Sequence, residues 1–465
     1  MKKNIYILIE NAQRELDGRI LLGLKLLKKN YNVVIGHKGS LLHIINKFNP
    51  GIVFFKSIGP LNTKIIKDLK YKNFKIVTCD EEMLATGKIE EMIDYRITKE
   101  NFMNTDIIFA VGNYDGEAIK RKFNEEDKVK LVGNLRIDTL KKPINNIFNE
   151  EVSYLNNKYG NYFLLGTQFG RINAENKNND FMIDSVFSLM SEGHKADSEL
   201  VKSYKKMFNY QRENMEKTIE FLIEFSNKIP DKKLIIKPHP NEKSGFWKNL
   251  IEKQKISNIF VFEDKKINTN SLILASECVI ACNSTILLES SFLNKKCINY
   301  IPLKKDENIE KEVLIKSSTT VRDIDTLIQN LKNIENIKNL DDKSNISNFI
   351  INYEENNFSS DKIVECLENL ELRKYNSHIT NLKYNIFLIT LSLLAKIKKI
   401  IKKTYDFKPK TNQQVLLKKL HNRKIGNLMS PNNFKIKTKL IAKTTGINNF
   451  KTREIVPNVF NILEK

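Results

Sequence analysis

Cysteine is scarce in this chain of 465 residues: there are five, an odd number, scattered along the sequence. Their scarcity excludes a disulfide scaffold and a cysteine-based zinc site, and it favours a reducing cytosol. The chain also lacks a GxGxxG fingerprint, which argues against a dinucleotide-dependent oxidoreductase. The first residues, MKKNIYILIENAQRELDG, reach acidic side chains too soon for a secretory signal, so they predict a β-strand.

Charge is distributed unevenly along the chain. Residues 371–465 contain 21 Lys plus Arg and four acids, whereas residues 1–370 contain 56 bases and 51 acids. Apolar residues make up 41% of the whole and charged residues 28%, which are values typical of globular proteins. The length suggests two or three domains, and the nearly neutral body and the basic extension are expected to meet different partners.

Short apolar runs alternate with stretches of helical spacing, a pattern typical of βαβ units and parallel sheets. A polar stretch at 141–160 separates two such series. The sequence therefore predicts two Rossmann-like domains, 1–150 and 151–370, whose parallel sheets face a cleft, followed by a basic helical extension at 371–465. The predicted strands are residues 4–9, 33–36, 52–55, 76–79, 107–111, 129–132, 162–166, 234–236, 259–262, 278–281 and 297–300, and the main predicted helices are 18–29, 41–48, 198–227 and 361–370.

The strongest local signal is LIIKPHPNE at 234–242, where an apolar strand ends at Lys237 and two prolines enclose His239. Because proline fixes its own φ and restricts the residue before it, the imidazole is held at the end of the strand. A histidine there can donate a hydrogen bond to a phosphate, or a proton to a phosphate leaving group. The structural alternative is a strand-end histidine in a proline turn, and we favour the functional interpretation.

A second signal, CVIACNSTILLESSF, begins 39 residues after His239. The strand at 278–281 leads into Asn283, Ser284 and Thr285, whose hydroxyls at a helix start suit a phosphate, and Glu289 one turn later can hold ribose hydroxyls. Plain helix capping is the alternative. A glycine-flanked strand exit at 166–170, GTQFG, also suits close approach by a phosphate. These segments give the predicted donor-binding residues Thr167, Gln168, Lys237, His239, Asn283, Ser284, Thr285 and Glu289.

The first series delivers the acids Asp80, Glu81 and Glu82 directly after the strand at 76–79. Clustered carboxylates repel one another, one pKa can rise, and a base for a sugar hydroxyl becomes available. An acid-rich helix start is the competing interpretation.

RELDG at 14–18 and GNLRID at 133–138 also follow strands, and they are predicted to line an acceptor site through Arg14, Asp17, Gly18 and Arg136. The structural alternatives are a helix cap for Asp17 and an ion pair for Arg136.

The extension contains an uncharged segment, YNIFLITLSLLA at 384–395, followed directly by KIKKIIKK. Twelve residues are too few to span a membrane. An apolar helix that ends in lysines can lie on an anionic membrane surface, and we favour this interpretation over a helix packed on the body or a nucleic-acid-binding arm.

In this order, ELDG, VVIGHK, DEE, GNLRID, KPHP and NSTILLE resemble the bacterial surface carbohydrate biosynthesis proteins, which have a GT-B glycosyltransferase fold. The likeness covers about residues 1–370. The acidic cluster, the HP dipeptide and the Ser/Thr pair are more distantly similar to bacterial sialyltransferases and Kdo transferases. That resemblance implies a base at Asp80 or Glu81, and it implies that His239, Ser284 and Thr285 contact the phosphate of a CMP-sugar.

These observations together predict a metal-independent, cofactor-free glycosyltransferase that moves a sugar from a nucleotide-activated donor, a CMP-sugar by preference, to a surface glycan or lipid-linked acceptor. The protein would be cytoplasmic and peripheral at the inner face of the cell membrane. The alternatives are a CDP-polyol phosphotransferase of the teichoic-acid type, a sugar-nucleotide 2-epimerase on the same fold, and a nucleic-acid-binding protein. The last is disfavoured because few aromatic residues stand between the lysines of the extension.

Overall fold

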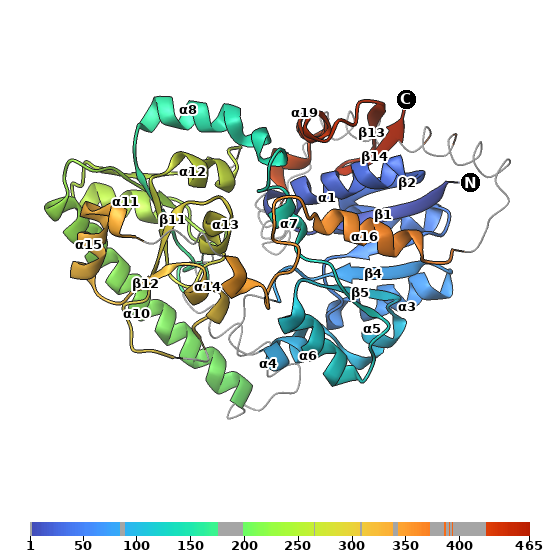
Figure 1. Ribbon diagram of the computed structural model, residues 1–465, viewed down its shortest axis with the longest axis horizontal. Helices are drawn as coiled ribbons and strands as arrows, with labels where there is room; N and C mark the ends of the chain where they lie inside the picture. The colour runs from blue at the N-terminus through green and yellow to red at the C-terminus, as the bar shows by residue number, and fades with distance from the viewer. Residues whose placement is uncertain are drawn as a thin grey trace, which may run out of the picture. The chain divides into compact units, whose positions relative to one another are not determined.

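A computed structural model of the protein describes residues 2–83, 89–174, 199–264, 266–306, 309–337, 343–372 and 425–465, together with positions 386, 390 and 393. The chain forms two compact units, each with its own sheet (Figure 1). Unit 1 comprises Met1–Leu84, Lys88–Ile147 and Ser347–Lys465, and unit 2 comprises Ala85–Gly87 and Phe148–Ile346. The division at 147/148 lies close to the predicted boundary at 150.

Unit 1 is built on an eight-stranded sheet in the order β13-β14-β2-β1-β3-β4-β5-β6. The six strands from the first part of the chain pair in parallel. They are β1 (Lys3–Ile9), β2 (Tyr31–His37), β3 (Ile52–Phe55), β4 (Lys75–Cys79), β5 (Ile107–Ala110) and β6 (Val129–Leu131). All six were predicted from the apolar runs, and the parallel α/β arrangement is confirmed.

Helices cover both faces of this sheet, which explains why its strands read as unbroken apolar runs. In β1, Ile5, Ile7 and Ile9 pack into one core, while Tyr6 and Leu8 pack into the other. The first core is completed by α1 (Ala12–Lys28), α7 (Leu135–Asp138), α16 (Ser359–Glu368) and α19 (Pro431–Thr445), and the second by α2 (Lys38–Ile44), α3 (Thr63–Tyr71), α4 (Ile89–Arg96), α5 (Lys99–Asn104) and α6 (Asn113–Phe123).

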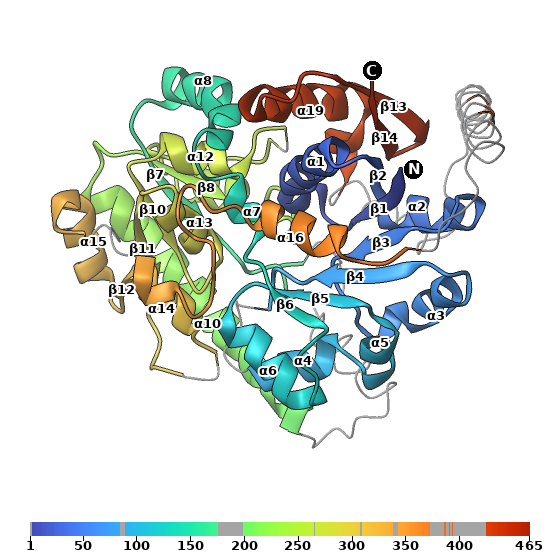
Figure 2. The ribbon, with the colours of Figure 1, turned by 45° about the vertical axis from the view of Figure 1, so that its right-hand side comes forward.

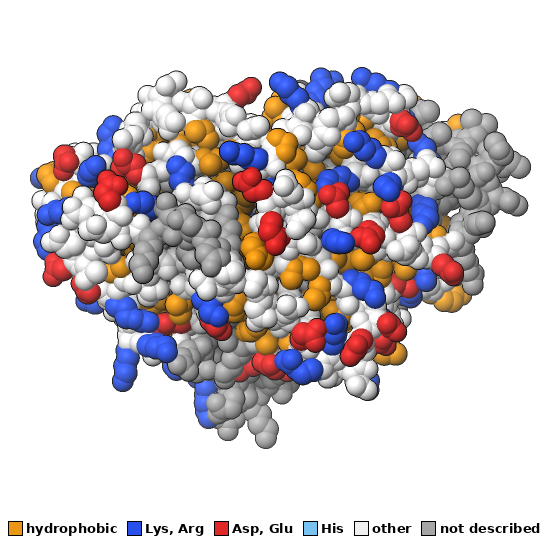
Figure 3. Space-filling model, in the orientation of Figure 1, with side chains coloured by type: hydrophobic (Ala, Val, Ile, Leu, Met, Phe, Trp, Pro, Cys, Tyr) orange, Lys and Arg blue, Asp and Glu red, His pale blue; other side chains and the backbone are white. Residues whose placement is uncertain are grey.

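The end of the chain is part of unit 1. β14 (Val459–Glu464) pairs antiparallel with β2, and β13 (Phe450–Val456) pairs antiparallel with β14. α16 and α19 both pack on α1 (Figures 1 and 2). On the face shown in Figure 3, lysines gather over α19, whose sequence includes Lys435, Lys437, Lys439 and Lys443.

This arrangement corrects the predicted domain limits, because residues 347–370 were assigned to the second domain and 371–465 to a separate extension. The physical reason lies in the segment that returns from unit 2. Asp138 is fully buried and accepts hydrogen bonds from the backbone N–H groups of Ser359 (2.8 Å) and Ser360 (2.7 Å). The Lys141 ammonium, also buried, donates to the Asn352 and Asn357 carbonyls. These contacts fix the start of α16 on unit 1.

Unit 2 contains a six-stranded, wholly parallel sheet in the order β12-β11-β10-β7-β8-β9. Its strands are β7 (Phe163–Gly166), β8 (Leu234–Lys237), β9 (Ile259–Val261), β10 (Cys278–Ala281), β11 (Lys296–Tyr300) and β12 (Thr319–Val321), and only β12 was not predicted. Its helices are α8 (Asn149–Tyr159), α10 (Glu199–Lys228), α11 (Phe246–Lys253), α12 (Thr269–Ala275), α13 (Ile286–Phe292), α14 (Glu312–Lys316) and α15 (Ile324–Lys332).

Two predicted segments differ from expectation or cannot be compared. The polar stretch at 141–160 is not a plain linker, because most of it folds as α8, whose Glu151 accepts hydrogen bonds from Asn268 N and Ser271 Oγ on the start of α12. The predicted membrane-surface segment, 384–403, lies outside the described residues except for positions 386, 390 and 393, which are helical. Among the described residues, no helix is long and apolar enough to cross a membrane.

Candidate functional site

The candidate site in unit 2 lies at the carboxyl ends of β7, β8 and β10, where a buried carboxylate joins the turns that follow β7 and β8. Glu242 is 4% exposed, and its Oε1 accepts hydrogen bonds from Thr167 Oγ1 (2.7 Å), Phe169 N (2.9 Å) and His239 N (3.2 Å). Trp247 Nε1 donates to Oε2 at 2.6 Å. Burial raises the pKa of Glu242, an effect that the bonds from Thr167 and Trp247 oppose. Glu242 therefore fixes the backbone on which the predicted histidine is carried.

His239 is placed as the sequence predicts, directly beyond the end of β8 between two prolines. Its Nδ1 accepts a hydrogen bond from Asn241 N at 3.2 Å, so the neutral ring carries its proton on Nε2. The turn after β7 packs against it, because a Cβ added at Gly170 would lie 3.2 Å from His239 Nδ1 and 2.8 Å from Asn241 Cβ. Glycine is required at 170 for this close approach, which brings the predicted GTQFG and KPHP segments together.

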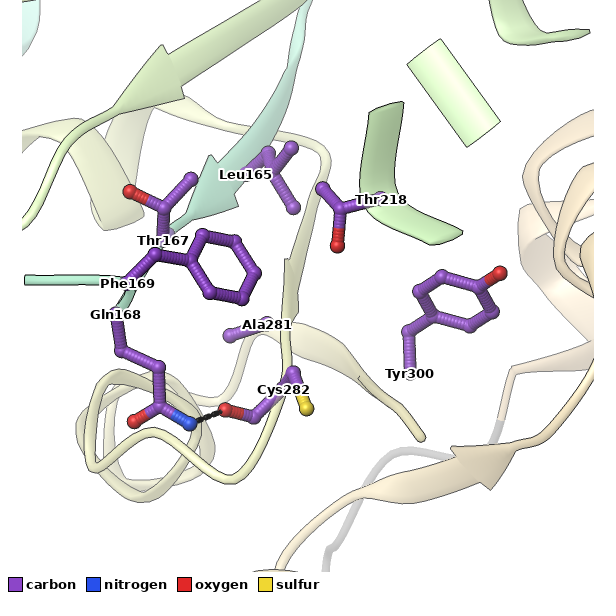
Figure 4. Close-up of a pocket in the computed structure, with 9 residues that line it drawn as sticks. Leu165, Thr167, Gln168, Phe169, Thr218, Ala281, Cys282 and Tyr300 are labelled. Carbon is purple, nitrogen blue, oxygen red and sulfur yellow. Dashed lines mark hydrogen bonds between the residues drawn. The ribbon is translucent and has the colours of Figure 1, made fainter. Parts of the chain in front are cut away.

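The turn after β10 is hydrogen-bonded to the turn after β7. Gln168, in the turn after β7, donates a hydrogen bond from Nε2 to the Cys282 carbonyl (Figure 4). Asn283 follows in the left-handed region with φ of 49°, and its N–H donates to Asn299 Oδ1 at 2.9 Å. Ser284 and Thr285 then lead into α13. Three predicted segments from separate parts of unit 2 therefore meet at one edge of the sheet.

The hydroxyls of Ser284 and Thr285 decide between the two interpretations of this turn. Thr285 occupies the N-cap position of α13, yet its side chain makes no capping hydrogen bond, and both residues are partly exposed. Within the part of the chain that the structure describes, plain helix capping therefore does not account for the Thr285 hydroxyl. Among the described residues, the Thr285 hydroxyl is thus left for a partner other than the helix start.

The cavity beneath these turns is too small for a substrate. It is lined by Leu165, Gly166, Thr167, Gln168, Phe169, Thr218, Ala281, Cys282 and Tyr300 (Figure 4). The space open to the centre of a water molecule is about 10 Å³, close to the minimum for a single water. A ligand larger than a water molecule would therefore have to bind outside this cavity.

The remaining predicted donor residues take neighbouring positions. Lys237 ends β8, and its Nζ lies 3.4 Å from the Pro238 carbonyl oxygen. Glu289 lies on α13, half-buried, one turn after Thr285, whose carbonyl accepts its N–H at 3.2 Å. Hydroxyls, an imidazole and an ammonium at the carboxyl edge of a parallel sheet form an arrangement that can bind an anion.

The predicted acidic cluster lies in unit 1, where β4 ends, and each carboxylate has a cationic partner. Asp80 Oδ2 accepts from Arg96 Nη1 at 2.6 Å, and Glu82 Oε2 accepts from Arg96 Nη2 at 3.0 Å. Lys56 Nζ lies 3.0 Å from Glu82 Oε1. Glu81 is buried, and its carboxylate lies 3.4 Å from the buried guanidinium of Arg19.

Burial and these cationic partners move the pKa values of Asp80 and Glu82 in opposite directions. Burial raises the pKa of Asp80, and the Arg96 guanidinium only partly offsets this effect. Burial acts in the same direction on Glu82, but Lys56, Arg14 and Arg96 outweigh it and hold its pKa well below the usual range. Repulsion between carboxylates, the predicted cause of a raised pKa, is therefore secondary to burial for Asp80.

The four predicted acceptor-side residues do not form one surface. Arg14 lies with the acidic cluster, 3.4 Å from Glu82. Arg136 is half-buried, and its partial burial and the like charge of Arg14 lower its pKa. Asp17 instead accepts a hydrogen bond from Lys437 of α19 at 2.7 Å. Gly18 lies inside α1, which begins six residues earlier than predicted, and a Cβ there would be 2.8 Å from the Leu135 carbonyl oxygen. Asp17 and Gly18 therefore make packing contacts of α1 with α19 and α7 inside unit 1.

Sequence reasoning did not single out Glu242, Lys56 or Arg96. Glu242 stands three residues after His239 in the quoted PHPNE motif, so a carboxylate at that spacing was a usable signal. Nothing in the sequence pointed to Lys56 or Arg96 as partners of the acids after β4. Lys56 directly follows β3 and Arg96 ends α4, so both are distant from these acids along the chain. Among the described residues, no group of three or more His, Cys, Asp or Glu is placed to hold a metal ion.

The sequence matches no protein-family model and no curated protein. Among solved structures, it is similar to a protein assigned as a UDP-N-acetylglucosamine 2-epimerase from Listeria monocytogenes, with 12% identity and a TM-score of 0.50, over 80% of this chain and 99% of that one. The chain has a GT-B-like fold. This confirms the predicted fold class, and at 12% identity the likeness establishes the fold alone.

Two further solved structures to which the chain is similar are UDP-GlcNAc 2-epimerases. The Methanocaldococcus jannaschii enzyme, in complex with UDP-GlcNAc and UDP, shares 16% identity with a TM-score of 0.48, over 79% of this chain and 99% of that one. The Neisseria meningitidis enzyme, bound to UDP-GlcNAc, shares 13% identity with a TM-score of 0.48, over 80% of this chain and 100% of that one.

Proposed function

We propose that this chain is an enzyme that acts on a nucleotide sugar and binds the nucleotide phosphate at the carboxyl edge of the unit 2 sheet. One observation supports this most strongly. Glu242 joins the turns after β7 and β8, Gln168 joins those after β7 and β10, and these turns carry His239, Ser284 and Thr285 at one edge of the sheet. Ligands of parallel α/β sheets bind at this edge.

Each group has a defined chemical role in the proposal. The Nε2–H of His239 donates a hydrogen bond to the phosphate and stabilises its charge as the sugar–oxygen bond breaks. Ser284 and Thr285 donate hydrogen bonds to the phosphate oxygens, and Glu289 accepts from ribose hydroxyls. Because these donors stabilise the charge on the leaving group, the proposed reaction needs neither a metal ion nor a cofactor.

For the reaction itself we favour epimerisation at C2 of the sugar over glycosyl transfer. The solved structure from Listeria monocytogenes named above supports the epimerase, which the sequence offered as an alternative. The reaction needs a group that removes a proton from a sugar carbon. Among the acids after β4, we propose Asp80 for this role, because burial raises its pKa, with Glu81 as the second candidate.

Glycosyl transfer is the second candidate, and it is favoured by a different observation, the ordered motifs ELDG, DEE, KPHP and NST. In that reaction Asp80 or Glu81 removes a proton from an acceptor hydroxyl. Attachment of the segment 384–403 to the inner membrane surface would keep the enzyme near a lipid-linked acceptor. Ile386 and Leu393, seven residues apart and both helical, are each 54% exposed, which suits such a surface helix.

A thermal-shift screen of wild type and His239→Ala against UDP, CMP, CDP and GDP tests the phosphate site. We expect at least one nucleotide to raise the wild-type melting temperature, and to raise that of His239→Ala clearly less. The matched control is His43→Ala, since His43 is an exposed histidine on α2, and it should behave as wild type. Equal stabilisation of wild type and His239→Ala would remove His239 from the site.

Product analysis separates the two reactions. If the protein is an epimerase, incubation with UDP-GlcNAc alone gives the C2 epimer, and in D₂O the product carries deuterium at C2. If it is a transferase, a nucleotide sugar is consumed only when an acceptor glycan is added. Consumption of CDP-glycerol in place of a nucleotide sugar would indicate the polyol-phosphate transferase instead.

A further inference from the structure

A lysine from a distant part of unit 2 reaches the turn that carries the two hydroxyls. Lys311 immediately precedes α14, and its Nζ donates a hydrogen bond to the Asn283 carbonyl at 2.9 Å. Asn283 is the residue before Ser284, so the ammonium lies at the base of this turn. Its charge is felt by the neighbouring Cys282 thiol as well, where it opposes the effect of burial on the pKa.

The position of Lys311 is fixed by the residue before it in the chain. Glu310 is 4% exposed and forms a two-point ion pair with Arg322, with distances of 3.1 Å and 2.8 Å. It also accepts from Asp306 N at 3.2 Å, and Asp306 pairs with Lys206 of α10 at 2.6 Å. A two-point guanidinium–carboxylate pair sets orientation as well as distance. The ion pair of Glu310 with Arg322 therefore fixes the backbone next to Lys311.

The turn that receives this ammonium contains an unsatisfied amide. Asn283 is 3% exposed, and in the part of the chain that the structure describes neither its side-chain oxygen nor its nitrogen has a hydrogen-bond partner. A buried amide without hydrogen-bond partners destabilises a fold. The Asn283 amide can therefore serve a further partner, together with the nearby Thr285 hydroxyl, which makes no capping hydrogen bond.

We propose that Lys311 is a phosphate-binding residue of this site, and that together with the Asn283 amide and the hydroxyls of Ser284 and Thr285 it binds the anionic leaving group of the nucleotide sugar. The proposal rests on the function proposed above. It adds an ammonium on the β10 side of the site to His239 and Lys237 on the β8 side. β7 lies between these two strands, so the nucleotide phosphates are bound from both sides of the turn after β7.

The test compares Lys311→Met with Lys316→Met, since Lys316 lies one turn further along α14 and pairs with Glu312 at the surface. The probes are UDP, CDP, GDP and CMP, each paired with its own nucleoside, and affinities are measured by displacement calorimetry. We expect Lys311→Met to weaken binding of the nucleotide at least tenfold while nucleoside binding changes less than twofold. Lys316→Met should leave both unchanged, and Lys311→Arg should recover part of the loss.

Two contrary outcomes are distinguishable. Equal loss of nucleotide and nucleoside affinity in Lys311→Met would show that the lysine only shapes the turn, and wild-type affinity in Lys311→Met would show that it plays no part; either result overturns this inference and leaves the proposed function standing. A wild-type protein that binds none of the four nucleotides overturns both.

Discussion

Replacement of Glu242 by glutamine gives the sharpest test of how the unit 2 site is built. Glutamine keeps the shape of the side chain, and its carbonyl oxygen can take the Oε1 position, where it accepts from Thr167, Phe169 and His239. Its amide nitrogen then faces Trp247 Nε1, which donates at 2.6 Å in the wild type. Two donors cannot satisfy each other, and at 4% exposure water cannot replace the lost acceptor.

The magnitude follows from these contacts. The substitution removes the hydrogen bond from Trp247 to a charged acceptor and leaves the buried Trp247 N–H unpaired. It also weakens the three hydrogen bonds to Oε1, because their acceptor is no longer charged. These losses are partly offset because the protein no longer buries a carboxylate, the burial that raises the pKa of Glu242. We expect a net loss of about 2–4 kcal/mol in the free energy of unfolding. Because His239 N is one of the donors, nucleotide binding should weaken as well.

The assay uses a property of the sequence: Trp247 is the chain's single tryptophan, and it is buried at the site. Urea unfolding followed by its fluorescence reports on unit 2. The control is a double-mutant cycle with Trp247→Phe, which removes the opposing donor, with all four proteins compared by circular dichroism. We expect Glu242→Gln to cost about 1–2 kcal/mol less when it is combined with Trp247→Phe. A loss below about 0.5 kcal/mol, or strict additivity, would refute the reasoning.

Three further predictions concern unit 1. Gly18→Ala should lower the free energy of unfolding by about 1–2 kcal/mol, because its Cβ would lie 2.8 Å from the Leu135 backbone oxygen. Gly23→Ala in the same helix, which would meet only side-chain atoms, should cost less in a urea titration followed by circular dichroism. Asp138→Asn should lower the free energy of unfolding by about 2–4 kcal/mol, since one of the two backbone N–H groups at the start of α16 loses its acceptor. Amide hydrogen exchange over 347–368 should become faster, and unchanged exchange would contradict this. Burial raises the pKa of Asp115 to about 6, because its effect exceeds that of the backbone hydrogen bonds, which lower the pKa. The folded protein therefore holds this proton more tightly than the unfolded chain does. The free energy of unfolding should consequently fall by about 3 kcal/mol as the pH rises from about 4 to 6. Asp115→Asn should flatten that slope, and an unaltered slope would show that Asp115 is not its source.

Much of the fold was predictable because it depends on local patterns. Strands covered by helices on both faces must be apolar at every position, and such runs are visible without knowledge of their partners, as in β1 and β10. The same holds for His239, whose position is restricted by the prolines next to it in the chain. The edge of the sheet to which each turn belongs followed from the parallel topology, so the meeting of GTQFG, KPHP and NST at one place was expected.

The sequence by itself determined the two parallel α/β layers and the turn residues that follow β7, β8 and β10, because hydrophobic period and proline chemistry act over a few residues. Only the tertiary structure decided what those turns are attached to. The residues 347–372 and 425–465 belong to unit 1 because Asp138 and Asp17 meet groups more than 200 residues away, at Ser359 and Lys437. Lys311 reaches Asn283 for the same reason, since hydrogen bonds between distant segments depend on how the chain returns in space and leave no periodic trace in the sequence.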